Sequence, residues 1–281
     1  MDGILLINKP LGYTSHDIVG KVRRTLHTKK VGHCGTLDPE ASGVLVVCVN
    51  KATKALQFLT SEDKHYIATI KLGIATDTYD MTGKVLREVP YQHDLTIDKV
   101  NDVLNQFKGK QKQVPPIYSA IKVNGKKLYE YARANEEVEI QPRDIEILSL
   151  ECLSFKDDEI QIKVHCSKGT YIRSLCVDIA EALGYPGCMS ALQRTQSGPF
   201  VLEDCFTLEQ LENNEYSMIS LDDALAHFPS LTIEDENIVY HGKTIKSSLE
   251  GQIAIKNKDG HILAIYEQVG NQTLKSVRGL W

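Results

Sequence analysis

The chain has 281 residues, a length that favours one large domain and a small one. Its residues are 42% hydrophobic, which is enough for a packed core. Its formal net charge is -5 and its isoelectric point is about 6.0, so bulk charge alone argues against a nucleic-acid-binding protein. The seven cysteines show no C-x-x-C spacing, and the sequence has neither a signal-peptide pattern nor an apolar run of membrane-spanning length. We therefore expect reduced thiols, a cytoplasmic location and no membrane contact.

The charge is unevenly distributed along the chain. Between Lys108 and Arg133 there are seven Lys or Arg residues and one acid, Glu130. Residues 21–30 carry five basic residues and no acid, whereas residues 200–242 carry ten acidic residues and no Lys or Arg. A basic face of this kind suits a polyanion, although a run of like charges is also the ordinary composition of a solvated surface.

The first predicted elements are a strand and a helix. Residues 3–7 form an apolar run typical of a strand, and residues 8–12 form a loop. Thr14 followed by Asp17 resembles a capping box and predicts the start of a helix. The apolar face of that helix is made of Ile18, Val19, Val22 and Leu26.

The stretch 31–49 joins a loop of turn-forming residues to a predicted buried strand at 43–49. The turn formers are Gly32, Gly35, Thr36, Asp38, Pro39, Ser42 and Gly43. In this setting Asp38 would be presented at a fixed point by a rigid scaffold, as functional loops commonly are. The same composition also describes an ordinary turn, and the stretch alone leaves both interpretations open.

The middle of the chain predicts short helices and one alternating strand. Residues 52–60 are expected to be helical, and residues 65–72 alternate as a strand that carries Tyr66 on its more apolar side. Taken alone, Tyr66 is most simply a core tyrosine. Residues 73–83 are a polar connection, and helical spacing follows at Val100, Val103, Leu104 and Phe107.

Residues 108–138 form a basic insert in which lysines are interleaved with tyrosines. Asn124-Gly125 is a strong hairpin signal. Interleaved lysines and tyrosines suit phosphate contacts and base stacking, and the weak apolar periodicity suits an element ordered by a ligand. An exposed surface loop is equally consistent with this composition.

Two strands are predicted at 145–155 and 160–166, followed by a helix that Thr170 is expected to cap. The apolar face of this helix is Ile172, Leu175, Ile179 and Leu183, with Gly184 at its end. Arg173 falls in the first turn, where the positive end of the helix dipole disfavours a cation. We therefore expect Arg173 to have a carboxylate partner.

The remaining chain predicts small elements. Residues 188–200 are interpreted as mixed loop and helix, and residues 203–228 as short helices. In the segment 231–281 we expect several short strands, notably at 252–255 and 261–266.

Five segments, in the order in which they occur, resemble the bacterial TruB family of tRNA pseudouridine synthases. They are GHCGTLDPEASGVL, DKHYIATIKLG, VPPIYSAIKVNGKKLYEYAR, SKGTYIRSL and ALQRTQSGPF. The resemblance implies an α+β fold with a mixed, largely antiparallel central sheet flanked by helices. It also implies a catalytic domain over 1–230 and a small β-rich PUA-like RNA-binding domain over 231–281.

The resemblance implies a role for each of five residues. Asp38 matches the catalytic aspartate, which attacks the flipped uridine so that the base detaches, rotates and rejoins through carbon. Arg173 matches the arginine that pairs with this aspartate and keeps it ionised. Tyr66 matches the tyrosine that stacks on the flipped base and is a candidate for proton transfer. Leu192 matches an apolar wall of the pocket, and His33 a histidine that helps to occupy the space left by the base.

The insert at about 108–138 resembles the RNA-gripping thumb of the family. The other residues assigned to RNA binding are Lys9, Tyr171, Lys122, Lys126 and Lys127. The expected partner is the T-arm stem-loop of tRNA, and no obligate protein partner is implied.

No cofactor is expected, because isomerisation of a base is redox-neutral and conserves all atoms, and the sequence has no P-loop or Rossmann fingerprint. No metal site is expected, because His33 and Cys34 lack a second ligand pair. A non-catalytic RNA-binding protein would explain the basic insert but would leave Asp38 and Arg173 without a purpose. A hydrolase with an aspartate nucleophile would need further carboxylates, for which Glu40 is the only close candidate.

Overall fold

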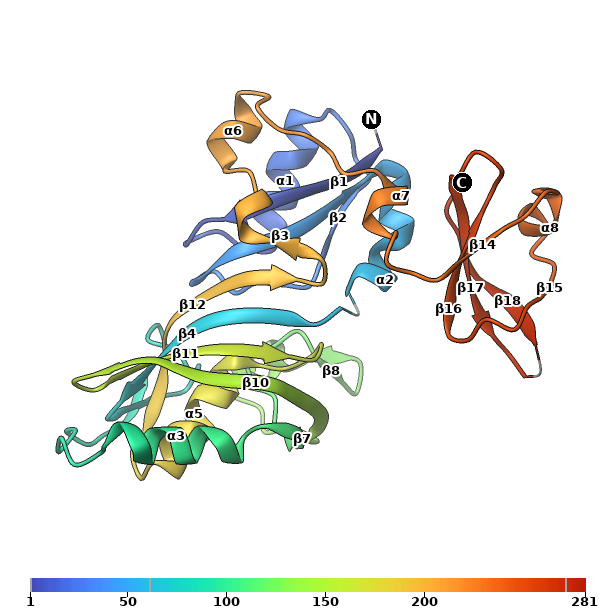
Figure 1. Ribbon diagram of the computed structural model, residues 1–281. Coiled ribbons are helices and arrows are strands. Elements are labelled where there is room, and N and C mark those ends of the chain that lie inside the picture. The colour runs from blue at the N-terminus through green and yellow to red at the C-terminus, as the bar shows by residue number, and fades with distance from the viewer. Residues whose placement is uncertain (1, 61, 271) are drawn as a thin grey trace. The chain divides into compact units, whose positions relative to one another are not determined.

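The computed structural model describes residues 2–60, 62–270 and 272–281 and has two compact units (Figure 1). The first unit comprises residues 1–39, 43–61 and 199–281, and the second comprises 40–42 and 62–198. In this division the segment 231–281 belongs with the N-terminal residues. The domain boundary at residue 230 therefore stays a prediction.

The N-terminal part of the first unit is built around β3, which lies between β1 and β2 and pairs with both in antiparallel register. The capping box of Thr14 and Asp17 is confirmed at the start of α1, whose apolar face packs against β1 and β3. The elements are β1 (Gly3–Lys9), α1 (Ser15–Thr25), β2 (Val31–Cys34), β3 (Ala41–Val49), the 3-10 helix η1 (Asn50–Ala55) and α2 (Leu56–Thr60).

The C-terminal part of the first unit contains the predicted short helices and ends in a five-stranded sheet, in the order β14-β16-β17-β18-β15. β14 pairs with β16 in parallel, and the other neighbours are antiparallel. Its elements are β13 (Phe200–Val201), η2 (Leu202–Asp204), α6 (Leu208–Glu212), α7 (Leu221–Ala224), β14 (Ser230–Thr232), α8 (Asn237–Tyr240), β15 (Ile245–Lys246), β16 (Gln252–Lys256), β17 (Ile262–Gln268) and β18 (Thr273–Gly279). This sheet confirms the predicted β-rich C-terminal segment.

The second unit contains an antiparallel sheet in the order β12-β4-β11-β10-β7. Helix α5 packs against β12 and β4, and α3 packs against β10 and α5 (Figure 1). The elements are β4 (Lys64–Leu72), β5 (Ile74–Thr76), β6 (Val85–Glu88), α3 (Ile97–Gln106), β7 (Gly109–Gln113), β8 (Lys122–Val123), β9 (Lys126–Lys127), α4 (Leu128–Ala134), β10 (Arg143–Lys156), β11 (Glu159–Cys166), α5 (Ile172–Ala182) and β12 (Gly187–Ser197). The largely antiparallel sheet with helices confirms the predicted fold class.

The interpretation of residues 188–200 as mixed loop and helix is wrong, because Gly187–Ser197 is the strand β12. The register of β12 against β4 shifts twice, between Met189 and Ala191 and between Arg194 and Gln196. Each shift breaks the alternation of buried and exposed side chains, which is the signal by which a strand is found in a sequence.

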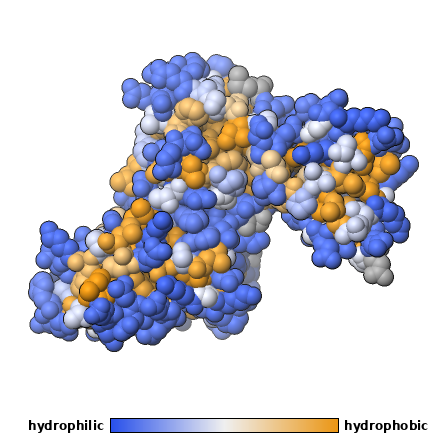
Figure 2. All heavy atoms as spheres, viewed as in Figure 1, coloured by the Kyte–Doolittle hydropathy of each residue, from blue (hydrophilic) through white to orange (hydrophobic). Residues whose placement is uncertain are grey.

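Polar side chains predominate on the face drawn in Figure 2, with apolar patches between them. In the part of the chain that the structure describes, no helix is both long and apolar enough to cross a bilayer.

Replacing Ile179 by Ala should lower the free energy of unfolding by about 2–5 kcal/mol, as is usual for truncating a buried aliphatic side chain. Ile179 is fully buried on α5, the helix that packs against β12 and β4. Urea unfolding followed by circular dichroism measures the effect. The matched control is Glu181→Ala on the same helix, where the side chain is exposed. Equal losses in the two variants would contradict this account of the core.

The contact between α7 and the start of β17 should depend on pH. His261 Nδ1 lies 2.9 Å from Asp222 Oδ2, and the hydrogen bond to this carboxylate raises the pKa of His261. The contact therefore adds stability that is fully present below the ordinary histidine pKa of about 6.5 and is lost as pH rises through the raised pKa. An NMR titration should give His261 a pKa above 6.5 that returns toward 6.5 in Asp222→Asn. The same pKa in both proteins would contradict the pairing.

Candidate active site

The loop that carries Asp38 connects β2 to β3 and is anchored on both sides of the aspartate. Leu37 is buried, and its backbone exchanges two hydrogen bonds with the Ser15 hydroxyl group, one donated by the Leu37 N–H at 2.8 Å and one accepted by its carbonyl at 3.1 Å. On the other side, Gly12 N–H donates to the Pro39 carbonyl at 2.9 Å. Asp38 itself is half-buried. The loop is therefore held as a fixed support for a carboxylate.

Lys9 at the end of β1 provides a third anchor. Its side chain is completely buried, and its ammonium group donates to the carbonyls of Pro10 at 2.9 Å, Tyr13 at 2.7 Å and Pro39 at 3.3 Å. A buried ammonium group is stable only when its donors are satisfied, as they are here. This geometry favours a role for Lys9 in holding the Asp38 loop. Its assignment to RNA binding stays a prediction.

His33 lies on β2 opposite Val47 and is half-buried. Its neighbour Cys34 is completely buried, with its sulfur atom 3.7 Å from that of Cys48. The hydrogen bond between the two thiols and their burial raise the pKa of Cys48, so this thiol is a poor nucleophile at neutral pH. Within residues 2–60, 62–270 and 272–281, no three His, Cys, Asp or Glu side chains are grouped as metal ligands.

Tyr66 and Leu192 lie on neighbouring strands of the second unit and on the same face of its sheet. Leu192 is paired with Ala68 in the register, and Arg194 with Tyr66. Tyr66 and Leu192 each keep 8% of their surface exposed, whereas Arg194 is 1% exposed. Two predicted pocket residues are thus brought together, with a buried arginine beside them. Charged residues are rarely buried inside a sheet. An arginine at an inward strand position was therefore the feature of the sequence that could have identified Arg194.

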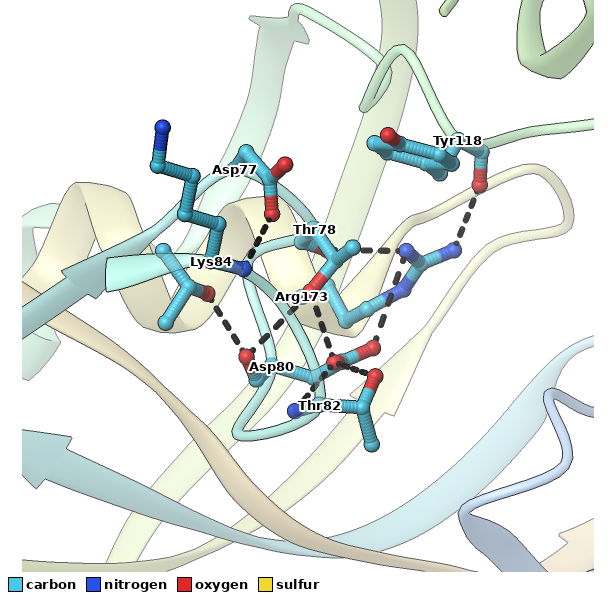
Figure 3. Close-up of polar contacts among 8 residues, drawn as sticks. Asp77, Thr78, Asp80, Thr82, Lys84, Tyr118 and Arg173 are labelled. Atoms are coloured by element: carbon cyan, nitrogen blue, oxygen red, sulfur yellow. Dashed lines mark hydrogen bonds and ion pairs between the residues drawn. The ribbon is translucent and has the colours of Figure 1, made fainter. Parts of the chain in front are cut away.

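Arg173 lies in the first turn of α5, as predicted, and its guanidinium group points to residues of two other segments (Figure 3). Nη1 donates to the Thr78 carbonyl at 2.9 Å, and Nη2 to the Tyr118 carbonyl, also at 2.9 Å. The carboxylate of Asp80 lies 3.9 Å from Nη1. Asp80 is a carboxylate neighbour of the kind expected for Arg173, but the sequence had not singled it out.

Asp80 is itself held in place by the connection that contains it. Its Oδ1 accepts hydrogen bonds from the Thr78 hydroxyl at 2.8 Å and from Thr82, through the hydroxyl at 2.6 Å and the N–H at 3.0 Å (Figure 3). The side chain is 11% exposed. A buried carboxylate with three donors and a neighbouring guanidinium group is a stable arrangement. The polar composition of 73–83 had indicated only a connection, because turn residues are used far more often for bends than for buried networks.

The expected cap of α5 by Thr170 is wrong. Thr170 donates its hydroxyl group to the Ser167 carbonyl, and the residue before the helix is Tyr171, which makes no side-chain cap. Instead, the side chain of Gln113 on β7 binds the backbone of Tyr171. It accepts from Tyr171 N–H at 2.8 Å and donates to the Tyr171 carbonyl at 3.1 Å. A glutamine far away in sequence thus anchors the start of the helix. A contact of the Tyr171 ring with RNA stays a prediction.

The basic insert begins as part of the sheet and continues as a small folded element. Residues 109–113 are the strand β7, paired with β10. The predicted hairpin is confirmed between β8 and β9, where Asn124 and Gly125 have φ angles of 50° and 82°. Both angles lie in the left-handed region that such tight turns require.

Several lysines of the insert contact its own aromatic rings and acids. Lys126 forms an ion pair of 2.7 Å with Glu136 and lies 4.6 Å from the centre of the Tyr131 ring. Lys127 and Arg133 lie 5.4 and 5.3 Å from the centre of the Tyr129 ring. Lys122 is exposed. The interleaving of lysines and tyrosines therefore already has a use within the free protein, and contacts of these lysines with RNA stay a prediction.

Comparison with known proteins identifies the family. Residues 23–172 match the profile of the TruB family pseudouridylate synthase N-terminal domain, and residues 173–228 match the tRNA pseudouridylate synthase B C-terminal domain. The chain is 46% identical over 291 aligned residues to tRNA pseudouridine synthase B of Bacillus subtilis, covering 95% of this chain and 93% of the relative. It is 44% identical over 284 residues to the protein of the same name from Bacillus cereus ATCC 14579, covering 95% and 92%.

A solved structure agrees with this assignment. A chain in the crystal structure of a Cbf5-Nop10-Gar1 complex is 26% identical, with a TM-score of 0.78 and coverage of 99% of this chain and 85% of that one. The matched profiles together span well over half of the sequence. The chain therefore belongs to the TruB family of tRNA pseudouridine synthases, which are isomerases.

Proposed function

We propose that this tRNA pseudouridine synthase isomerises the T-loop uridine of tRNA, and that Asp38 is its nucleophile. The observation that carries the proposal is the anchored Asp38 loop, in which hydrogen bonds from Lys9, Gly12 and Ser15 fix the backbone on both sides of the carboxylate. A nucleophile must be held close to its target atom, because proximity and orientation supply much of the catalytic effect. The five motifs of the sequence support the same assignment.

In the proposed reaction the uridine leaves its stack and enters the pocket, at a cost of a few kcal/mol. Asp38 attacks the nucleotide, and the bond between C1′ and N1 breaks. The base then rotates, a bond forms between C1′ and C5, and the bond between Asp38 and the nucleotide breaks, which regenerates the carboxylate. The proton leaves C5 and N1 gains one, so no atom is gained or lost overall. Every step can be carried by protein groups and water, so the proposal requires neither a metal nor a cofactor.

Tyr66 and Arg173 complete the proposed site. Tyr66 would stack on the flipped base, and its hydroxyl group is a candidate for the proton transfer at C5. Arg173 would face the Asp38 carboxylate and keep it ionised, as a nucleophile requires. Leu192 would form the apolar wall, and His33 would help to fill the space that the base leaves. The T-arm of tRNA is the proposed RNA partner, and action without an obligate protein partner stays a prediction.

Replacing Asp38 by Asn should abolish pseudouridine formation and leave the affinity for a T-arm hairpin within a few-fold. An amide has nearly the same shape as the carboxylate but is a poor nucleophile, and phosphate contacts elsewhere should dominate binding. A uridine with tritium at C5 provides the assay, since isomerisation transfers that atom to water. Tritium release by Asp38→Asn would remove Asp38 from the mechanism. No release by the wild type would instead favour a non-catalytic RNA-binding protein.

Replacing Asp80 by Asn should lower kcat by roughly 10-fold to 100-fold, because Arg173 loses the carboxylate beside it and a misplacement of about 1 Å can cost this much. KM for the hairpin should change little. The matched control is Asp77→Asn in the same connection, whose side chain accepts a hydrogen bond from Lys84 N–H at 2.8 Å. If the two variants lose activity equally, or if kcat falls only together with the melting temperature, the role of Asp80 in positioning Arg173 is wrong.

A further inference from the structure

We propose that Leu11 and Tyr13 form an apolar contact surface for the nucleosides that flank the flipped uridine. This inference rests on the proposed role of Asp38 and names a part of the substrate that the same site recognises. The two residues lie in the loop between β1 and α1, and both side chains are accessible. Leu11 is 58% exposed and Tyr13 is 37% exposed. The two residues are separated in sequence only by Gly12.

The loop of Leu11 and Tyr13 is joined directly to the loop of Asp38. Gly12, between the two residues, donates its N–H to the Pro39 carbonyl at 2.9 Å. The ammonium group of Lys9 binds the Tyr13 carbonyl at 2.7 Å and the Pro39 carbonyl at 3.3 Å. The two loops therefore form one rigid element. Leu11 and Tyr13 therefore lie at a fixed distance from Asp38 and from any RNA atoms that Asp38 contacts.

Gly12 gives this loop its particular shape. Its φ angle is 78°, in the left-handed region that residues with a Cβ atom rarely adopt. The turn at Gly12 presents the side chains of Leu11 and Tyr13 to solvent and leaves the backbone bonded to Pro39.

The ring of Tyr13 is further fixed by a cation. Lys21 Nζ lies 5.6 Å from the ring centre and forms an ion pair of 2.7 Å with Glu212. Because Lys21 is held by Glu212, it can restrain the ring. The opposite end of α1 and the residues after it carry exposed cations suited to phosphate groups. These are Arg24, Lys29 and Lys30.

Base flipping indicates which part of the RNA would contact Leu11 and Tyr13. When a uridine leaves its stack, the faces of the neighbouring bases lose their partner. Apolar and aromatic side chains cover such faces in proteins that distort or unstack nucleic acids. An apolar pair that is rigidly attached to the Asp38 loop, with Lys21 beside the Tyr13 ring, suits the exposed base faces of an unstacked segment of RNA.

A cycle of protein and RNA changes tests the proposal directly. Binding is measured with Asp38→Asn as the parent protein, so that the hairpin is not converted. One T-arm hairpin is intact, and a second lacks the bases of the two nucleotides that flank the target uridine. Leu11→Ser and Tyr13→Ser should each weaken binding of the intact hairpin about 10-fold, the size expected for a lost base contact. On the second hairpin each should change binding less than about 2-fold, because the partner is already absent.

Matched variants distinguish the loss of this contact from a general loss of folding or of RNA affinity. Tyr13→Phe keeps the ring and should bind both hairpins as the parent does. Leu148→Ser removes an apolar side chain on β10 that is 44% exposed, and it should have no effect on either hairpin. Melting temperatures of all variants should agree with that of the parent.

Two results would overturn the proposal. Equal losses on the two hairpins would mean that Leu11 and Tyr13 act through the fold and not through the flanking bases. No loss on either hairpin would mean that the surface serves another partner, such as a protein. The tritium assay on the wild type is a separate measurement, so absence of isomerisation would contradict the proposed function without deciding the binding cycle.

Discussion

The geometry of the Asp38 loop depends on one buried charge, the ammonium group of Lys9. Removing such a charge from water costs several kcal/mol unless hydrogen bonds replace its hydration. Three backbone carbonyls do so here, and they belong to residues on both sides of the site, Pro10 and Tyr13 in one loop and Pro39 in the other. Because the charge is stable only when all three carbonyls converge, the position of Lys9 determines the shape of both loops.

Arg173 has the same function in the second unit. Arg173 is 5% exposed, and its guanidinium group binds the carbonyls of Thr78 and Tyr118, with Asp80 beside it. A lysine could not replace it, because the planar guanidinium group directs several donors at fixed angles toward different segments. In this way α5, the connection at 73–83 and the insert are ordered by one side chain. Both units thus use a buried cation to hold irregular segments that have little apolar surface of their own.

The sequence predicted the regular elements well and the polar networks poorly, for a physical reason. The strands at 3–7 and 43–49 are buried on both faces and leave continuous apolar runs in the sequence, whereas the helix that begins at Ile172 leaves apolar residues at helical spacing. Gln113 at the start of α5 leaves no such signal, because its partner is the backbone of a residue distant in sequence. The turn-rich loop drew attention to Asp38 and the first turn of the helix to Arg173, but their catalytic roles and their pairing came only from the five family motifs. Asp80 was missed because a turn-rich connection is usually just a turn.

The charge distribution also has a different meaning once the contacts are known. Seven cations lie within residues 108–133, and like charges so close in sequence would repel one another if they had no partners. The contacts of Lys126 with Glu136 and Tyr131, and of Lys127 and Arg133 with Tyr129, reduce this repulsion. An RNA phosphate must therefore compete with an existing partner for Lys126, whereas Lys122 is exposed to solvent. If the insert binds RNA as proposed, its lysines should contribute unequally to the affinity, and a count of basic residues in the segment would overstate the net electrostatic gain on binding.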